Sequence, residues 1–203
     1  MNPFPNNFTK YYNNEKFSDM RIRTTNGDIW VHSIIMSSSS SVFETYLSSS
    51  LNKNNIFELI DHDTDAVEYV LKWIYSSGED VNIETKEQYI NVLAVSNFLG
   101  LRLTSIISGG SYREYVLYFR NKLGFTTVEL IQLAHLYNNN MLIQCAASLY
   151  YSMRFDLDDV IDFSELSLSE YTMFYAICKC RNYDRKCDGA LSLLKPRKLH
   201  MRK

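Results

Sequence analysis

A short hairpin near the amino terminus constrains the fold of this chain more than any other feature. Residues 20–23, MRIR, alternate between apolar and charged side chains, and an apolar arm, IWV, resumes at residues 29–31. Alternation with a period of two is typical of strands that bury one face. Asn26 and Gly27 lie between the arms, and this dipeptide tolerates positive φ at both central positions of a tight turn. The segment therefore predicts a β-hairpin.

An aspartate and a histidine flank this hairpin: Asp19 precedes the first arm and His32 follows the second. Catalysis by the two groups and a purely structural role are the two hypotheses. Buried polar side chains persist when they are hydrogen-bonded, so a structural pair would hold the fold in one arrangement. We favour the structural hypothesis.

The segments on either side of the hairpin have helical spacing. Phe8, Tyr11 and Tyr12 lie three and four residues apart, which predicts one short helix with an aromatic face. Residues 33–51 follow the same spacing, interrupted by the serine run of residues 37–41. Serine is a favoured N-cap, so we expect this run to end one helix and begin the next; a phosphorylation site is the alternative.

Beyond residue 54 the sequence alternates between strand-like and helix-like segments. NIFELI, residues 55–60, predicts a buried strand, and DVNI, residues 80–83, predicts a short one. Between them, residues 61–78 begin with acidic side chains and continue as an apolar stripe of helical period. Residues 85–100 begin with the T-x-x-Q pattern of a capping box and end at a glycine, as helices often do. These elements predict an α+β fold.

The second half of the chain is helical in period, after a candidate boundary near the Gly-Gly pair at residue 110. Short breaks between amphipathic helices predict antiparallel neighbours. The predicted helices span residues 113–123, 126–137, 141–155, 156–166 and 167–180. Residues 179–203 carry nine Lys or Arg against two Asp, which makes a basic tail.

Composition and charge exclude several classes of protein. A formal net charge of -2 argues against a globally basic nucleic-acid binder. No run reaches the roughly 18 apolar residues that a spanning helix needs, so we expect no membrane partner. The amino terminus has no positive region followed by an apolar one, and the four cysteines all lie in the last third. We therefore expect an intracellular, cytoplasmic or nuclear protein with reduced thiols.

No pattern in the sequence points to an enzyme. The four histidines are scattered, and neither a nucleophile elbow, a P-loop nor a dinucleotide-binding glycine fingerprint occurs. The acidic run DHDTD, residues 61–65, resembles a metal nest, but it stands where a helix must begin. Cys178, Cys180 and Cys187, with His200 beyond, lack the spacing of a structural zinc site. We predict no catalytic residue, metal or cofactor.

The order of these motifs resembles a known family. FSDMRIRTTNGDIWVHSIIMSSSSSVFETYLSSSL, residues 17–51, is similar to the BTB/POZ signature, in which F-x-D starts a strand and a histidine opens the first core helix. Residues 65–81 and 90–101 resemble its later helix pairs, and the likeness covers residues 8–107. Residues 126–171 resemble the BACK domain of Kelch-like proteins, poxvirus-type ones above all, although no Kelch repeats follow.

This resemblance implies a BTB/POZ fold, a small sheet with surrounding helices, over residues 1–108. A partial BACK-like helical domain at 109–178 and the basic tail at 179–203 complete the expected organisation. The family implies a protein–protein interaction module that forms homodimers, or heterodimers with other BTB proteins, and acts as an adaptor for, or competitor of, cullin-3 ubiquitin ligase complexes. The implied dimer-interface residues are Phe8, Tyr11, Tyr12, Asp19, His32 and Ser33, and the implied cullin-facing residues are Tyr46, Leu51 and Lys53.

The residue after the histidine departs from the family pattern. Relatives usually carry Lys or Arg there, placed to neutralise the aspartate, whereas this chain has Ser33. We therefore expect Asp19 to pair with Arg21 or Arg23, or to be partly solvated.

A second departure concerns cullin binding. Cullin-binding relatives carry a hydrophobic-x-Glu motif that aligns with residues 51–53, where Leu51 keeps the apolar anchor and Lys53 replaces the acid. Reversing a charge at the rim of an interface costs about 1–3 kcal/mol. An alternative function is that of a DNA-associated transcription cofactor, dimerised by its BTB domain, whose basic tail contacts nucleic acid.

Overall fold

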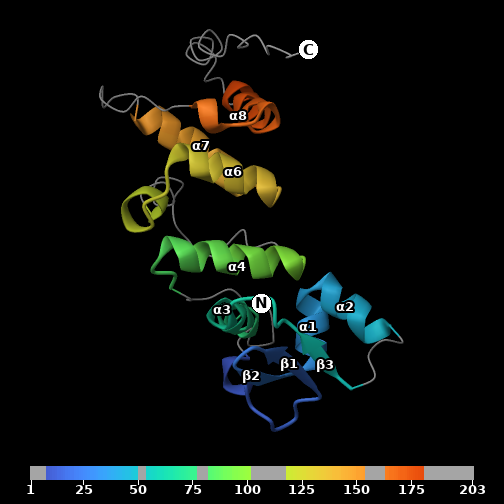
Figure 1. Ribbon diagram of the computed structural model, residues 1–203. Coiled ribbons are helices and arrows are strands. Elements are labelled where there is room, and N and C mark those ends of the chain that lie inside the picture. The colour runs from blue at the N-terminus through green and yellow to red at the C-terminus, as the bar shows by residue number, and fades with distance from the viewer. Residues whose placement is uncertain (1–7, 50–53, 77–81, 102–117, 154–162, 181–203) are drawn as a thin grey trace, which may run out of the picture. The chain divides into compact units, whose positions relative to one another are not determined.

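The structure is a computed structural model that describes residues 8–49, 54–76, 82–101, 118–153 and 163–180 (Figure 1). The chain divides into two compact units, Met1–Gly110 and Ser111–Lys203. The first contains strands and helices, and the described part of the second is helical. The predicted α+β class is confirmed.

A three-stranded mixed sheet forms the base of the first unit. Strand β1 (Met20–Thr24) pairs antiparallel with β2 (Gly27–Val31) and parallel with β3 (Ile56–Glu58), in the order β2-β1-β3. Ile22 lies opposite Ile29 on one side and Phe57 on the other, and all three are buried. The alternation read from the sequence thus places one apolar face against the core.

The hairpin is confirmed, but its turn differs from the prediction. Thr24 pairs with Gly27, so Thr25 and Asn26 are the central residues and Gly27 already belongs to β2. Among these residues positive φ occurs at Gly27, at 134°, and the Thr24 hydroxyl donates to the Gly27 carbonyl oxygen over 3.0 Å. Strand pairing shifted the loop by one residue, because the buried alternation of β1 and β2 sets the register.

The serine run separates two helices, as expected. Helix α1 (Ser33–Ser39) ends at Ser40, whose φ of -137° is extended, and α2 (Ser41–Ser48) begins directly after it. The Ser40 hydroxyl accepts from the Phe43 N–H and donates to the Leu99 carbonyl oxygen over 2.6 Å. One buried serine therefore caps α2 and ties it to the chain just beyond α4.

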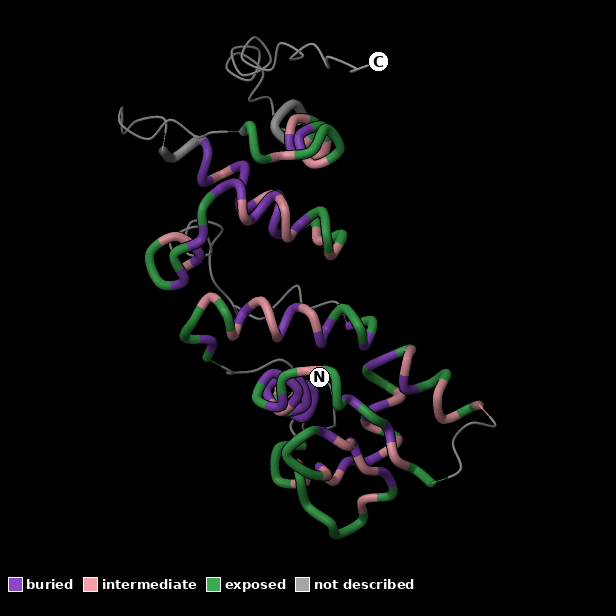
Figure 2. Tube along the Cα trace, in the orientation of Figure 1, coloured by how far each residue is buried: buried purple, intermediate pink, exposed green. Residues whose placement is uncertain are grey.

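Two longer helices complete the core of this unit. Helix α3 (Thr64–Tyr75) is buried along much of its length (Figure 2), and α4 (Lys86–Phe98) packs against it. Asp63 caps α3 by accepting from the Ala66 N–H, which confirms the role assigned to the acidic run. At α4 the Thr85 hydroxyl accepts from the Gln88 N–H, but the Gln88 side chain bonds the Glu84 N–H, so the predicted capping box is half formed.

Two expected elements are shorter or missing. The aromatic amino-terminal helix is reduced to a 3₁₀ turn, η1 (Thr9–Tyr11). Asn82 and Ile83 do not form the strand predicted for DVNI, and residues 80 and 81 lie outside the described residues. Gly78, taken as the end of the preceding helix, is also outside them, and α3 ends at Tyr75.

In the second unit, helices α6 (Thr127–Leu136), α7 (Asn140–Met153) and α8 (Leu168–Cys180) pack on one another. Thr126 and Glu129 form a complete capping box at α6, and Tyr150 meets Phe174 edge to face at 5.6 Å between ring centroids. The predicted helix at residues 113–123 is described from residue 118, as a single π-type turn, η2 (Tyr118–Lys122). Of the segment 156–166, the described part is the 3₁₀ turn η3 (Phe163–Glu165) and the residue after it.

Replacing Gly100 with alanine is expected to destabilise the first unit by about 1–2 kcal/mol. Gly100 ends α4 at φ 65°, and the Leu101 N–H reaches back to the Ser96 carbonyl oxygen over 2.8 Å, as in a Schellman motif. An added Cβ would also lie 3.2 Å from the Ser41 Oγ. Urea unfolding followed by tryptophan fluorescence measures the change, because both tryptophans, Trp30 and Trp73, belong to this unit.

Gly124→Ala is the matched control for this prediction. Gly124 has a similar φ of 69°, nothing lies within 4 Å of its added Cβ, and it belongs to the second unit. The tryptophan-reported transition should therefore not move. An unchanged transition in Gly100→Ala would contradict the assigned role of the helix end.

Candidate interaction surface

An apolar groove lies beside α1 in the first unit. It has a volume of about 560 Å³ and combines the residues next to η1 and β1 with α1 and the end of α3. Its lining residues are Phe8, Tyr11, Phe17, His32, Ile34, Ile35, Ser38, Ser39 and Ile74. No metal-binding group of three or more His, Cys, Asp or Glu side chains occurs within the residues that the structure describes.

Large apolar side chains of the groove face solvent. Phe17 is 73% exposed, Ile34 is 76% exposed and Phe8 is 39% exposed. Isolated exposed apolar residues are ordinary, but several that line one groove mark a surface that a partner covers. The groove is therefore the best candidate interaction surface of this unit.

His32 forms one wall of the groove and is held by the core. It is the N-cap residue of α1, and its backbone N–H donates to the Tyr75 hydroxyl over 2.8 Å. The same hydroxyl lies 2.9 Å from the His32 Nδ1. The hydroxyl oxygen accepts from the amide, and the bond with Nδ1 is made by the Nδ1 proton or, in the other tautomer, by the hydroxyl's own proton. Burial raises the pKa of Tyr75 to about 12, so the hydroxyl keeps this proton.

Asp19 lies at the amino end of α1, on the rim of the groove. Its Oδ1 accepts from the Ser33 N–H over 2.7 Å and its Oδ2 from the Ser33 hydroxyl over 2.5 Å. Burial raises the pKa of Asp19, but these hydrogen bonds outweigh it and hold the pKa below its ordinary value. The Asp19 side chain is exposed, in agreement with the alternative of a partly solvated carboxylate.

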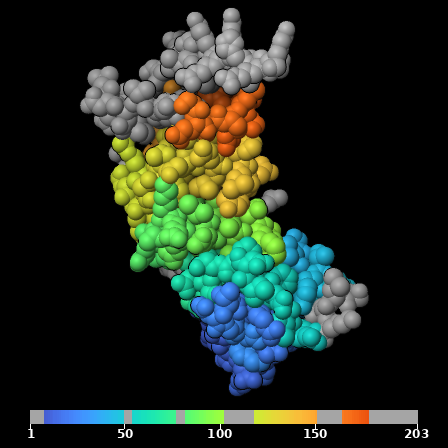
Figure 3. Space-filling model, in the orientation of Figure 1, coloured from blue at the N-terminus to red at the C-terminus, as the bar shows by residue number. Residues whose placement is uncertain are grey.

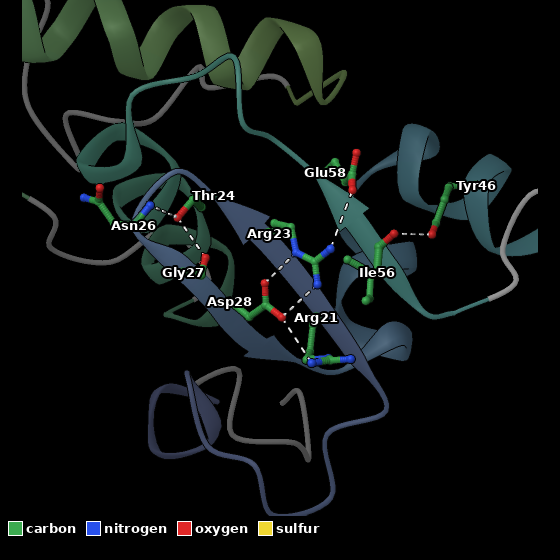
Figure 4. Close-up of polar contacts among 9 residues, drawn as sticks. All are labelled: Arg21, Arg23, Thr24, Asn26, Gly27, Asp28, Tyr46, Ile56 and Glu58. Atoms are coloured by element: carbon green, nitrogen blue, oxygen red, sulfur yellow. Dashed lines mark hydrogen bonds and ion pairs between the residues drawn. The ribbon is translucent and has the colours of Figure 1, made fainter.

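The other alternative, the pairing of Asp19 with Arg21 or Arg23, is wrong. Both arginines lie on β1 and reach across to Asp28 on β2, at 3.1 Å and 3.0 Å, and Arg23 lies 3.8 Å from Glu58 on β3 (Figure 4). Asp28 faces β1 directly across the hairpin, so it competes for the arginines better than Asp19 does. Hydrogen bonding to Arg23 lowers the pKa of Asp28.

The other predicted interface residues fall in two places. Tyr12 packs edge to face on Tyr75, at 5.7 Å between ring centroids, beside the groove. Tyr46 lies on α2, and its hydroxyl donates to the Ile56 carbonyl oxygen of β3 over 2.6 Å (Figure 4). Leu51 and Lys53 lie outside the described residues. The sequence analysis did not identify Phe17, Ile34 and Ile74 as groove residues. The two consecutive isoleucines at positions 34 and 35 were the signal that the sequence offered.

The remaining sequence candidates form no metal-binding group within the part of the chain that the structure describes. His62, in the acidic run, packs its ring on Phe98 at 4.9 Å. Cys145 is a buried free thiol, and the side chains of Cys178, Cys180 and Cys187 lie outside the described residues.

In the space-filling view the hairpin and the segment from β3 to α3 form adjoining surface of the first unit (Figure 3). None of the described helices is long and apolar enough to cross a bilayer.

Comparison with known proteins places this geometry in a family. The model of the BTB/POZ domain matches residues 8–105. Residues 8–105 form a BTB/POZ domain. Among solved structures, the BTB domain of zebrafish PATZ1 is similar at 18% identity, over 44% of this chain and 70% of that one, with a TM-score of 0.38. No curated protein matches the chain.

The BTB domain is typically a non-catalytic module for protein–protein interaction and dimerisation. The predicted BTB/POZ fold is therefore confirmed for this part of the chain. The groove, with exposed Phe17 and Ile34, lies within the matched residues.

Proposed function

We propose that this chain is an intracellular interaction protein that dimerises through the groove face of its BTB domain. In this role it acts as an adaptor for, or competitor of, cullin-3 ubiquitin ligase complexes. The observation that carries the proposal is the exposure of Phe17 and Ile34 on one apolar groove. Two such grooves covered by one another would remove this apolar surface from water.

The predicted interface residues support a dimer at this face. Phe8, Tyr11 and His32 line the groove, and Asp19 and Ser33 are hydrogen-bonded at its rim. A symmetric dimer uses the same patch of both chains, so each of these residues would enter the interface twice. The same face would accept another BTB protein and so divert it from its own complexes.

The cullin-facing surface is proposed at α2 and the residues that follow it. Tyr46 is held rigidly there, since its hydroxyl bonds the Ile56 carbonyl oxygen and its ring meets Phe57 at 4.9 Å between centroids. A side chain fixed before binding loses little entropy in a complex. Leu51 would supply the apolar anchor, and Lys53 stands in place of the acid of cullin-binding relatives.

The second unit is proposed to extend this surface as a partial BACK-like domain over residues 109–178, as in poxvirus-type Kelch-like proteins. The support is the sequence likeness of residues 126–171 and the packing of α6, α7 and α8 on one another. The domain limits at residues 108 and 178 stay predictions.

Titration of the full chain with the purified amino-terminal region of cullin-3 tests the proposed partner. We expect a dissociation constant in the low micromolar range, and we expect Lys53→Glu to tighten it about tenfold, because it restores the acid at the rim. Isothermal titration calorimetry measures both values.

Lys122→Glu, the same charge reversal in the second unit at η2, is the control and should leave the affinity unchanged. Absence of binding by both the wild type and Lys53→Glu would remove cullin-3 from the proposal. Dimerisation is tested separately, by the variant Ile34→Glu.

A further inference from the structure

The rim of the groove carries a carboxylate that forms no ion pair among the described residues. Asp19 accepts two hydrogen bonds from Ser33, through one N–H and one hydroxyl. The four ion pairs found among the described residues use Asp28, Glu58 and Glu68 as acids and do not include Asp19. The adjacent imidazole of His32 turns its Nδ1 to the Tyr75 hydroxyl. Asp19 thus brings to this face a negative charge that no ion pair of the described residues neutralises, although the neighbouring His32 helps to lower its pKa.

Covering the groove would remove water from that charge. Phe17, His32 and Ile34 line the groove and lie within two residues of Asp19 or Ser33, so a partner seated there also covers the carboxylate. An ionised carboxylate accepts about four hydrogen bonds, and Ser33 donates two. A buried charge left without a partner is strongly unfavourable.

A symmetric homodimer increases the electrostatic cost of covering Asp19. Because both chains use the same patch, each brings its own Asp19 to the interface, and neither brings a cation from the described rim. Unpaired like charges are a device by which interfaces reject one partner and select another. The groove attracts apolar surface, while its rim selects for positive charge.

We propose that the preferred partner of this face is a different BTB domain that presents a Lys or Arg side chain to Asp19, so that the chain forms heterodimers in preference to homodimers. This inference rests on the proposed dimerisation through the groove. The small neutral side chain of Ser33 leaves the cation to the partner.

Asp19→Asn tests the cost of the charge in the homodimer. Asparagine keeps the shape and one acceptor for the Ser33 N–H, so the fold is retained. We expect self-association of the full chain, measured by sedimentation equilibrium, to tighten about tenfold. Glu87→Gln removes one exposed carboxylate from the first turn of α4, away from the groove, and should leave self-association unchanged. Equal dissociation constants for wild type and Asp19→Asn would overturn the inference.

A mixing experiment tests the preference for a cation. The double variant Asp19→Asn, Ser33→Lys carries a positive charge where the wild type carries a negative one. The double variant is mixed with an equal amount of ¹⁵N-labelled wild type, and the dimers are distinguished by native mass spectrometry. Random pairing would make half of the dimers mixed, and we expect a fraction well above that. A statistical mixture would overturn the charge preference alone, whereas the absence of dimers in every chain and mixture would overturn the proposed function as well.

Discussion

Ile34→Glu is expected to weaken dimerisation of the chain about a hundredfold or more. Ile34 is 76% exposed in the single chain and lines the groove, so a glutamate there is solvated in the monomer and buried in the dimer. Burying an unpaired carboxylate, together with the loss of an apolar anchor at an interface, costs about 2–4 kcal/mol or more. Sedimentation equilibrium of the full chain measures the change in the dissociation constant.

Ile60→Glu is the matched control for this result. Ile60 is also exposed, at 47%, and belongs to the same unit, but it does not line the groove. The control should dimerise like the wild type, and both variants should keep the wild-type unfolding midpoint at dilute concentration. If Ile34→Glu dimerised as tightly as Ile60→Glu, the groove would not be the dimer interface.

Tyr75→Phe is expected to destabilise the BTB domain by about 2–4 kcal/mol. The Tyr75 hydroxyl serves both the backbone N–H of His32 and its Nδ1, at 2.8 Å and 2.9 Å, inside the core. Phenylalanine fills the same space but leaves two buried polar groups unpaired, and each such group costs its full desolvation. Urea unfolding followed by the fluorescence of Trp30 and Trp73 reports the loss from this domain alone.

Tyr12→Phe is the control that distinguishes the hydrogen bonds of the Tyr75 hydroxyl from the mere removal of a buried tyrosine hydroxyl. Tyr12 packs on Tyr75, and its buried hydroxyl has no hydrogen-bond partner among the residues that the structure describes. Removing it should change stability by no more than about 0.5 kcal/mol, or increase it slightly. Equal losses in Tyr12→Phe and Tyr75→Phe would mean that the bond to His32 contributes little.

Ile34 and Tyr75 belong to the same part of the domain, where α1 and α3 border the groove. The bonds from Tyr75 fix the start of α1 to the end of α3, and His32 and Ile74 on these elements both line the groove. The side of the groove formed by α1 and α3 is therefore held by the domain core, whereas Phe8 and Phe17 lie outside helices and strands. A preorganised surface loses less entropy on binding, which favours tight association.

Both members of the polar pair that flanks the hairpin are hydrogen-bonded, but not to each other. His32 bonds Tyr75, and Asp19 bonds Ser33, so the two side chains serve different elements. A sequence pattern indicates which side chains need hydrogen-bond partners, but it left several candidate donors for Asp19. The packed structure decided among them, since Asp28 on the facing strand occupies Arg21 and Arg23.

Features written within a few consecutive residues were determined by the sequence itself: the hairpin, the serine cap between α1 and α2, and the acidic start of α3. Alternation, capping and dipole effects act over one or two turns, so local spacing specifies them. The tertiary structure alone decided the turn register, the bond between His32 and Tyr75, 43 residues apart, and the groove beside α1. Those features depend on which faces of distant segments pack together, and that packing minimises exposed apolar surface and buried unpaired polar groups over the whole domain.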